Sequence, residues 1–140
     1  MLQSIVINYL NTHPIGVAYT APFDVYLSDI NVFQPDILYV SNDRKKHLTP
    51  KGMEGAPDFV AEVLSPGTDR FDCGPKRQVY IRNGVNELWI LNPEKREIQI
   101  YRPNEDPQKP VSTVGAIDQV ESPLFPGLTI HISEIFKDDV

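Results

Sequence analysis

Apolar residues recur at the spacing of β-strands through most of the chain. Phe23, Val25 and Leu27 alternate with more polar neighbours, which is typical of a half-buried strand. Positions 59–64 form the most strand-like run, because they are apolar apart from the carboxylate of Glu62. Further strands are predicted at 37–40, 87–91, 97–101, 111–114 and 128–132.

Three segments have the features of helices. Residues 4–13 place their apolar side chains close to helical spacing and stop at a proline, as helices do. A second helix is expected to begin near Cys73, with Asp72 as its N-cap, and to end at the Asn-Gly pair 83–84. A short third helix is predicted to start at Ser133.

The remaining sequence indicates one domain built from short elements. The polar stretch 41–57 contains charged residues and two glycines, so we expect an exposed loop there. The chain has 13 prolines in 140 residues, nearly twice the usual ~5%, which favours stiff turns and excludes a bundle of long helices. We therefore predict a single α+β domain over residues 1–140 with a mixed sheet.

Charge and cysteine content narrow the function classes. The formal net charge of −6 gives no general attraction to nucleic acid, so a nucleic-acid role needs a local basic face or a bridging metal. A lone cysteine, Cys73, forms no internal disulfide. The sequence has no apolar run of roughly 18 residues and no signal-peptide pattern at its start, so we expect a cytoplasmic protein without a membrane partner.

Three ionisable residues have positions suited to catalysis. Asp36 opens a predicted strand, Glu62 lies inside an apolar strand where an unpaired carboxylate is costly, and Lys76 lies on the following helix. A strand-borne Asp and Glu separated by a loop can converge at the end of a sheet and form an oxygen site for Mg²⁺, with the Val63 carbonyl as a third oxygen. A nearby ammonium group would orient water or stabilise charge on a phosphate.

Other interpretations of these residues stay open. Glu62 could instead pair with a basic side chain for structural reasons alone. Asp58 shares a strand face with Glu62 but lies ~13 Å from it at ~3.3 Å per residue, so we expect it to support the site or to begin the strand. The basic residues 44–46 are either a solvated loop or, if they lie beside Asp36, a contact for a nucleic-acid backbone. The three histidines have no spacing typical of a metal site.

The motifs along the chain form a recognisable series. Pro35-Asp36 precedes an apolar run, and Pro57-Asp58 leads through Glu62 to Ser65-Pro66. The later positions of the series are Lys76, Tyr80, Gly84-Val85, Glu87-Leu88-Trp89 and Pro93. Together they resemble the Uma-type putative restriction endonuclease family of the PD-(D/E)XK nuclease-like superfamily. The resemblance extends with lower specificity from about Val17 to the end of the chain.

The resemblance implies a restriction-endonuclease-like fold, a mixed β-sheet flanked by helices, and hydrolysis of DNA with Mg²⁺ or Mn²⁺. It implies that Asp36 and Glu62 bind the metal. The plain motif would put lysine at position 64, where this chain has leucine, so the family's displaced lysine corresponds to Lys76. Tyr80 follows one helical turn later on the same face.

The N-terminal sequence departs from the family pattern. Related chains begin with a longer amphipathic helix that can supply another acidic residue, whereas here no Asp or Glu precedes Asp24. We therefore expect a shortened N-terminal helix. Together with the acidic charge, this keeps a second interpretation open, namely a catalytically inactive, self-associating interaction domain on the same fold. The expected partners are DNA and a second copy of the chain in a homodimer.

Overall fold

The centre of the protein is a six-stranded mixed sheet. A computed structural model describes residues 2–65, 69–103 and 110–136. The sheet has the order β1-β4-β7-β8-β9-β10, and all neighbours are antiparallel except the parallel pair β7 and β8. Its strands are β1 (Gly16–Thr20), β4 (Ile37–Ser41), β7 (Phe59–Val63), β8 (Glu87–Asn92), β9 (Glu97–Tyr101) and β10 (Ser112–Gly115). The predicted α+β fold with a mixed sheet is confirmed.

Smaller elements surround this sheet. A four-stranded sheet has the order β3-β2-β6-β5, and β11 pairs with β12. These strands are β2 (Val25–Tyr26), β3 (Val32–Phe33), β5 (Leu48–Thr49), β6 (Gly52–Glu54), β11 (Gln119–Glu121) and β12 (Thr129–His131). The helices are α1 (Leu2–Thr12), η1 (Asn42–His47, a 3-10 helix), α2 (Asp69–Arg82) and α3 (Ile132–Ile135).

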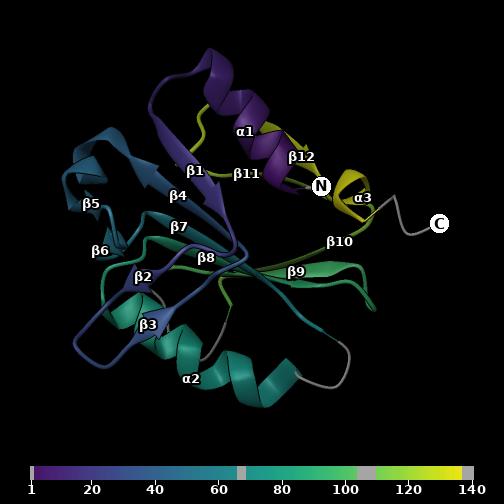
Figure 1. Ribbon diagram of the computed structural model, residues 1–140. Helices are drawn as coiled ribbons and strands as arrows, with labels where there is room; N and C mark the ends of the chain where they lie inside the picture. The colour runs from purple at the N-terminus through teal and green to yellow at the C-terminus, as the bar shows by residue number, and fades with distance from the viewer. Residues whose placement is uncertain (1, 66–68, 104–109, 137–140) are drawn as a thin grey trace.

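The large sheet separates two layers of packing. Figure 1 shows α1 and the β11–β12 pair on one side of the sheet and α2 on the other. Because successive strand residues point to opposite faces, each strand contributes to both cores. The face toward α1 and α3 carries Ile37, Tyr39, Phe59, Ala61, Trp89 and Leu91. The face toward α2 carries Val60, Leu88, Ile90 and Tyr101, which pack with Tyr80, Ile81 and Val85.

The end of α2 is fixed by a glycine. Gly84 has a φ of 108°, a conformation that residues with a side chain rarely adopt. The N–H of Gly84 donates to the Ile81 carbonyl at 3.3 Å, and the N–H of Val85 donates to the Tyr80 carbonyl at 3.1 Å. This pair of bonds is a Schellman motif, and it satisfies carbonyl groups that the helix end would otherwise leave without partners. The predicted stop at positions 83–84 is confirmed.

Several element boundaries differ from the sequence predictions. Helix α2 begins at Asp69, before the predicted N-cap Asp72 and start near Cys73; the side chains of residues 69–74 lie outside the description. The stretch 41–57 is wrongly predicted as one exposed loop, because it contains η1, β5 and β6, and Met53 is fully buried. Strands β1 and β11 were not predicted, since neither has a run of large apolar residues.

A buried carboxylate ties β8 to the chain beyond β9. Glu87 accepts hydrogen bonds from Trp89 Nε1 at 2.8 Å and from Arg102 Nε at 2.9 Å. The Glu87 side chain is 2% exposed, whereas Arg102 is 37% exposed. Glu87 is one of the motif residues, and these contacts give it a structural role. No helix within the described ranges is long and apolar enough to cross a membrane.

Replacing Arg102 should therefore destabilise the fold. In Arg102→Ala, the Glu87 carboxylate stays buried and loses its cationic partner, so we expect the free energy of unfolding to fall by roughly 2–4 kcal/mol. Urea denaturation measures this change. The exposed Arg82→Ala serves as the control and should change stability by less than about 0.5 kcal/mol. Equal stability of the Arg102 and Arg82 variants would contradict a structural role for the pair.

Candidate functional site

Strand pairing brings Asp36 and Glu62 together. In the antiparallel pair of β4 and β7, Ile37 lies opposite Ala61. One further step in this register places Asp36 opposite Glu62, on the face of the sheet that α2 covers. The negative charge of Asp36 acts on the pKa of the Glu62 carboxyl, which agrees with their closeness. The sequence prediction that these two carboxylates converge at a sheet end is thus confirmed.

The backbone of Val63 holds the Asp36 side chain. The Val63 N–H donates a hydrogen bond of 2.7 Å to Asp36 Oδ2. This contact fixes one carboxylate oxygen against the end of β7 and leaves Oδ1 without a hydrogen-bond donor among the described residues. The Val63 side chain is 42% exposed, so the end of β7 lies at the protein surface.

Helix α2 supplies two further groups to Glu62. The Tyr80 hydroxyl donates a hydrogen bond of 2.7 Å to Glu62 Oε2, and Lys76 Nζ lies 4.0 Å from the same oxygen. Lys76 and Tyr80 are one turn apart, so both reach the sheet from the same helix face. The predicted juxtaposition of Asp36, Glu62 and Lys76 is therefore present, and Tyr80 contacts the same carboxylate.

The surroundings of Glu62 disfavour its charged form. Burial raises the pKa of the Glu62 carboxyl above its ordinary value of 4.5, and the charge of Asp36 acts in the same direction. The Tyr80 hydrogen bond, the Lys76 ammonium group and the Asp36 backbone lower this pKa, but together by less than burial and the Asp36 charge raise it. A buried carboxylate with a raised pKa beside a second acid is typical of functional sites, although structural ion pairs produce it as well.

Phe33 also belongs to this cluster, although no sequence motif pointed to it. Its ring contacts the Tyr80 ring edge-on, with centroids 5.2 Å apart, and Lys76 Nζ lies 5.5 Å from the Phe33 centroid. Phe33 lies three residues before Asp36, and this closeness is the feature of the sequence that could have pointed to it. A single aromatic residue in a two-residue strand gives no indication of which helix it will meet.

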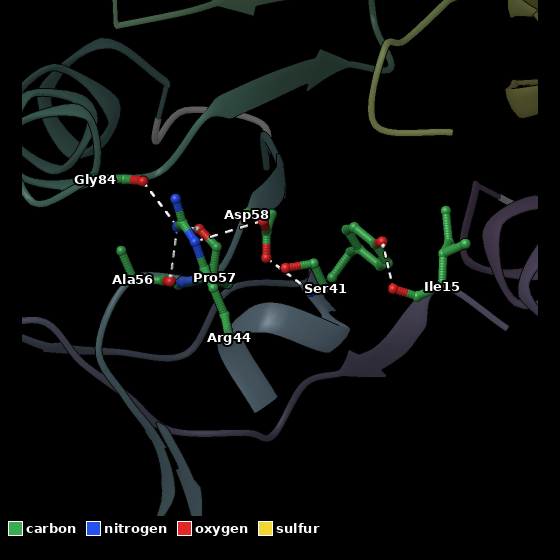
Figure 2. A network of polar contacts seen from close by, with 8 residues as sticks. Ile15, Ser41, Arg44, Ala56, Pro57, Asp58 and Gly84 are labelled. Atoms are coloured by element: carbon green, nitrogen blue, oxygen red, sulfur yellow. Dashed lines mark hydrogen bonds and ion pairs between the residues drawn. The ribbon is translucent and has the colours of Figure 1, made fainter. Parts of the chain in front are cut away.

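Asp58 lies at the other end of β7 and belongs to a separate network (Figure 2). Its carboxylate accepts a hydrogen bond of 2.7 Å from the Ser41 N–H and lies 3.5 Å from Arg44 Nε. Arg44 Nη1 also donates to the carbonyls of Ala56, Pro57 and Gly84. Asp58 therefore begins the strand, which is one of the two roles predicted for it.

The basic residues 44–46 do not lie beside Asp36. They follow the end of β4, whereas Asp36 precedes its start, so the whole strand separates them. In addition, the Arg44 guanidinium group binds backbone carbonyls of the protein itself. The suggestion that this segment contacts nucleic acid next to Asp36 is therefore wrong, because the antiparallel strand carries the chain away from the site.

The two carboxylates fit a divalent metal ion of the hard type. Among the described residues, no group of three or more His, Cys, Asp and Glu side chains is placed to hold a metal. Within the described part of the chain, Asp36 Oδ1 receives no hydrogen bond, and the Glu62 carboxylate is held by the Tyr80 hydroxyl and the Asp36 backbone. Mg²⁺ accepts one or two carboxylates and completes its shell with water and phosphate oxygens, and Mn²⁺ prefers the same oxygen ligands. The donor set therefore suits these ions and does not suit a fully protein-ligated site.

The raised pKa of Glu62 predicts that the ionised Glu62 side chain lowers the free energy of unfolding at neutral pH. A group whose pKa is higher in the folded state stabilises the fold below its unfolded pKa, and this contribution is lost as pH rises through the folded pKa. In metal-free protein, Glu62→Gln should therefore raise the midpoint of urea unfolding at pH 7, and the difference from the wild type should disappear near pH 4. The exposed Glu121→Gln is the control. If Glu62→Gln lowers stability at pH 7, a raised pKa is contradicted, since the charged carboxylate would then stabilise the fold.

Comparisons with known proteins agree with the fold. A family model described as "Putative restriction endonuclease", Uma2, matches residues 2–133. A crystal structure of a putative nuclease belonging to DUF820 from Anabaena variabilis has a TM-score of 0.76 and 20% sequence identity, and the match covers 96% of this chain and 75% of that one. This likeness shows a shared fold.

A curated relative matches a smaller part of the chain. It is the "Uncharacterized protein slr1290" of Synechocystis sp., which is 30% identical over 82 residues. The match covers 58% of this chain and 43% of the relative, so it spans less than half of that protein's length. The family model, in contrast, extends over nearly the whole sequence. The chain belongs to the Uma2 family of putative restriction endonucleases.

Proposed function

We propose that the protein is a metal-dependent nuclease that hydrolyses DNA phosphodiester bonds at Asp36, Glu62 and Lys76. The observation that carries this proposal is the pairing of Asp36 with Glu62 across β4 and β7, with the Lys76 ammonium group 4.0 Å from Glu62 Oε2. Membership of the Uma2 family and the likeness to a putative nuclease fold support it.

The charges of the cluster make a divalent cation necessary for binding DNA. With both acids ionised, two negative charges face one positive charge, so the cluster on its own repels a phosphate. The net charge of −6 adds to this repulsion over longer distances. Asp36, Glu62 and the Val63 carbonyl would hold Mg²⁺ or Mn²⁺. When bound, such an ion activates water and neutralises charge on the scissile phosphate.

Each side chain has a distinct role in the proposed reaction. A water oxygen forms a new bond to phosphorus, one ester P–O bond breaks, and the departing oxygen takes up a proton. The Lys76 ammonium group donates hydrogen bonds toward the attacking water or a phosphate oxygen, where negative charge develops. Tyr80 is a positioning residue, because its hydroxyl donates the hydrogen bond that holds Glu62 Oε2 in place.

The first test is cleavage of DNA by the purified protein. With Mg²⁺ or Mn²⁺ we expect cleavage that EDTA abolishes. Asp36→Asn and Glu62→Ala should each lower the rate by at least ~100-fold, because each removes a metal-binding charge. Lys76→Met should lower it by roughly 10²–10³-fold, a loss comparable to that of one preorganised charge-stabilising donor.

Glu121→Gln is the matched control, since Glu121 is an exposed residue of β11 on the other side of the large sheet. Its rate should equal that of the wild type. If folded protein cuts no single- or double-stranded DNA with either ion, the nuclease proposal fails. The alternative of a catalytically inactive, self-associating domain is then favoured. Self-association into the predicted homodimer is tested separately by measuring how the oligomeric state depends on protein concentration.

Metal binding itself can be measured without DNA. Because an ion that binds only the folded state raises the melting temperature, Mg²⁺ or Mn²⁺ at about 100 times the dissociation constant should stabilise the fold by about 2.7 kcal/mol. The shift should be absent in Glu62→Ala and present in Glu121→Gln. Equal shifts in both variants would place metal binding elsewhere on the protein.

A further inference from the structure

The Phe33 side chain contacts both α2 partners of Glu62. Its ring meets the Tyr80 ring at an interplanar angle of 63° with centroids 5.2 Å apart. Lys76 Nζ lies over the same ring, 5.5 Å from its centroid. Phe33 lies on β3, three residues before Asp36, so it connects the segment that supplies one acid with the helix that supplies the amine.

The Lys76 side chain needs such a contact to keep its place. It has four rotatable bonds, is 41% exposed, and its distance of 4.0 Å from Glu62 Oε2 is at the outer limit for an ion pair. A partly exposed pair of this kind is weak. A cation within about 6 Å of an aromatic centroid is attracted by the negative face of the ring, which adds a second restraint on Nζ.

Tyr80 is restrained by the same ring in a different way. The Tyr80 side chain is almost fully buried, and its hydroxyl must point at Glu62 Oε2 to donate the 2.7 Å hydrogen bond. Edge-on contact between the two rings limits how far the Tyr80 ring can tilt. One residue therefore restrains both groups that meet at the same carboxylate oxygen.

We propose that Phe33 is a positioning residue that holds the Lys76 ammonium group and the Tyr80 hydroxyl against Glu62 in the arrangement needed for cleavage. The catalytic consequence of this inference rests on the proposed function. Its structural part, the placement of Lys76 by the ring, concerns the free protein and can be tested without any activity.

The structural part is tested by NMR on the metal-free protein without DNA. Protons above the face of an aromatic ring are shielded, so the Cε protons of Lys76 should resonate upfield of those of exposed lysines; Lys76→Arg assigns the signal. Phe33→Leu keeps an apolar side chain but removes the ring, and it should return this signal to the ordinary lysine position. Phe33→Tyr should preserve the shift. An unshifted wild-type signal, or one that Phe33→Leu leaves in place, would overturn the proposal.

The catalytic part is tested by the kinetics of the same variants. Phe33→Leu should lower kcat by roughly three- to tenfold with little change in KM, because positioning matters most in the transition state. Phe33→Tyr should restore most of the rate. The neighbouring Val32→Ala is the control, since Val32 is 45% exposed and alternate strand residues point to opposite sides.

A double-mutant cycle separates positioning from a general effect on folding. In a chain that already carries Lys76→Met and Tyr80→Phe, Phe33→Leu should cost no further activity, because both groups through which it acts are absent. A loss that persists in this background would overturn the proposal, since Phe33 would then act through the fold. If the wild type has no nuclease activity, the proposed function fails and the NMR result alone decides whether Phe33 places Lys76.

Discussion

The antiparallel pairing of β4 with β7 is the constraint on which the site depends. The register that sets Ile37 against Ala61 also brings Asp36 to the level of Glu62. A slip of one residue would turn every side chain of one strand to the other face, moving Glu62 into the core beneath α1. That slip is opposed by the many apolar residues that alternate between the two cores. The packing of the sheet therefore fixes the separation of the two acids.

Glu62 illustrates how a fold tolerates an unfavourable group. Its carboxylate lies in a largely apolar strand, and burial alone would disfavour its charge. Helix α2 compensates with a hydroxyl and an ammonium group, both directed at one oxygen. Compensation is incomplete, since the pKa of this residue stays raised. A second cation near Asp36 and Glu62 would lower this pKa and so favour the charged carboxylate.

The sequence was most informative where local pattern and tertiary structure agree. Alternating and continuous apolar runs located β4, β7, β8 and β9, and the strand-borne acids followed from them. The segment 41–57 was not predictable in this way, because Met53 is a single apolar residue among polar and glycine neighbours. The start of α2 was predicted too late, because Asp72 is a residue type that favours helix N-caps although the helix already begins at Asp69. The role of Phe33 was hidden because its partners are 43 or more positions away.

The packing of α1 against the C-terminal segment has a consequence for folding during synthesis. The Tyr9 hydroxyl donates to the Pro126 carbonyl at 2.6 Å, across 117 positions of sequence, and Leu2 and Val6 share a core with Ile132. An isolated helix of 11 residues is marginal in water. Helix α1 is therefore not fully buried until the segment that contains Pro126 and Ile132 has been synthesised. Contacts of such long range slow folding, so one face of the growing sheet stays open to chaperones or to other chains until residues 126–132 have been made.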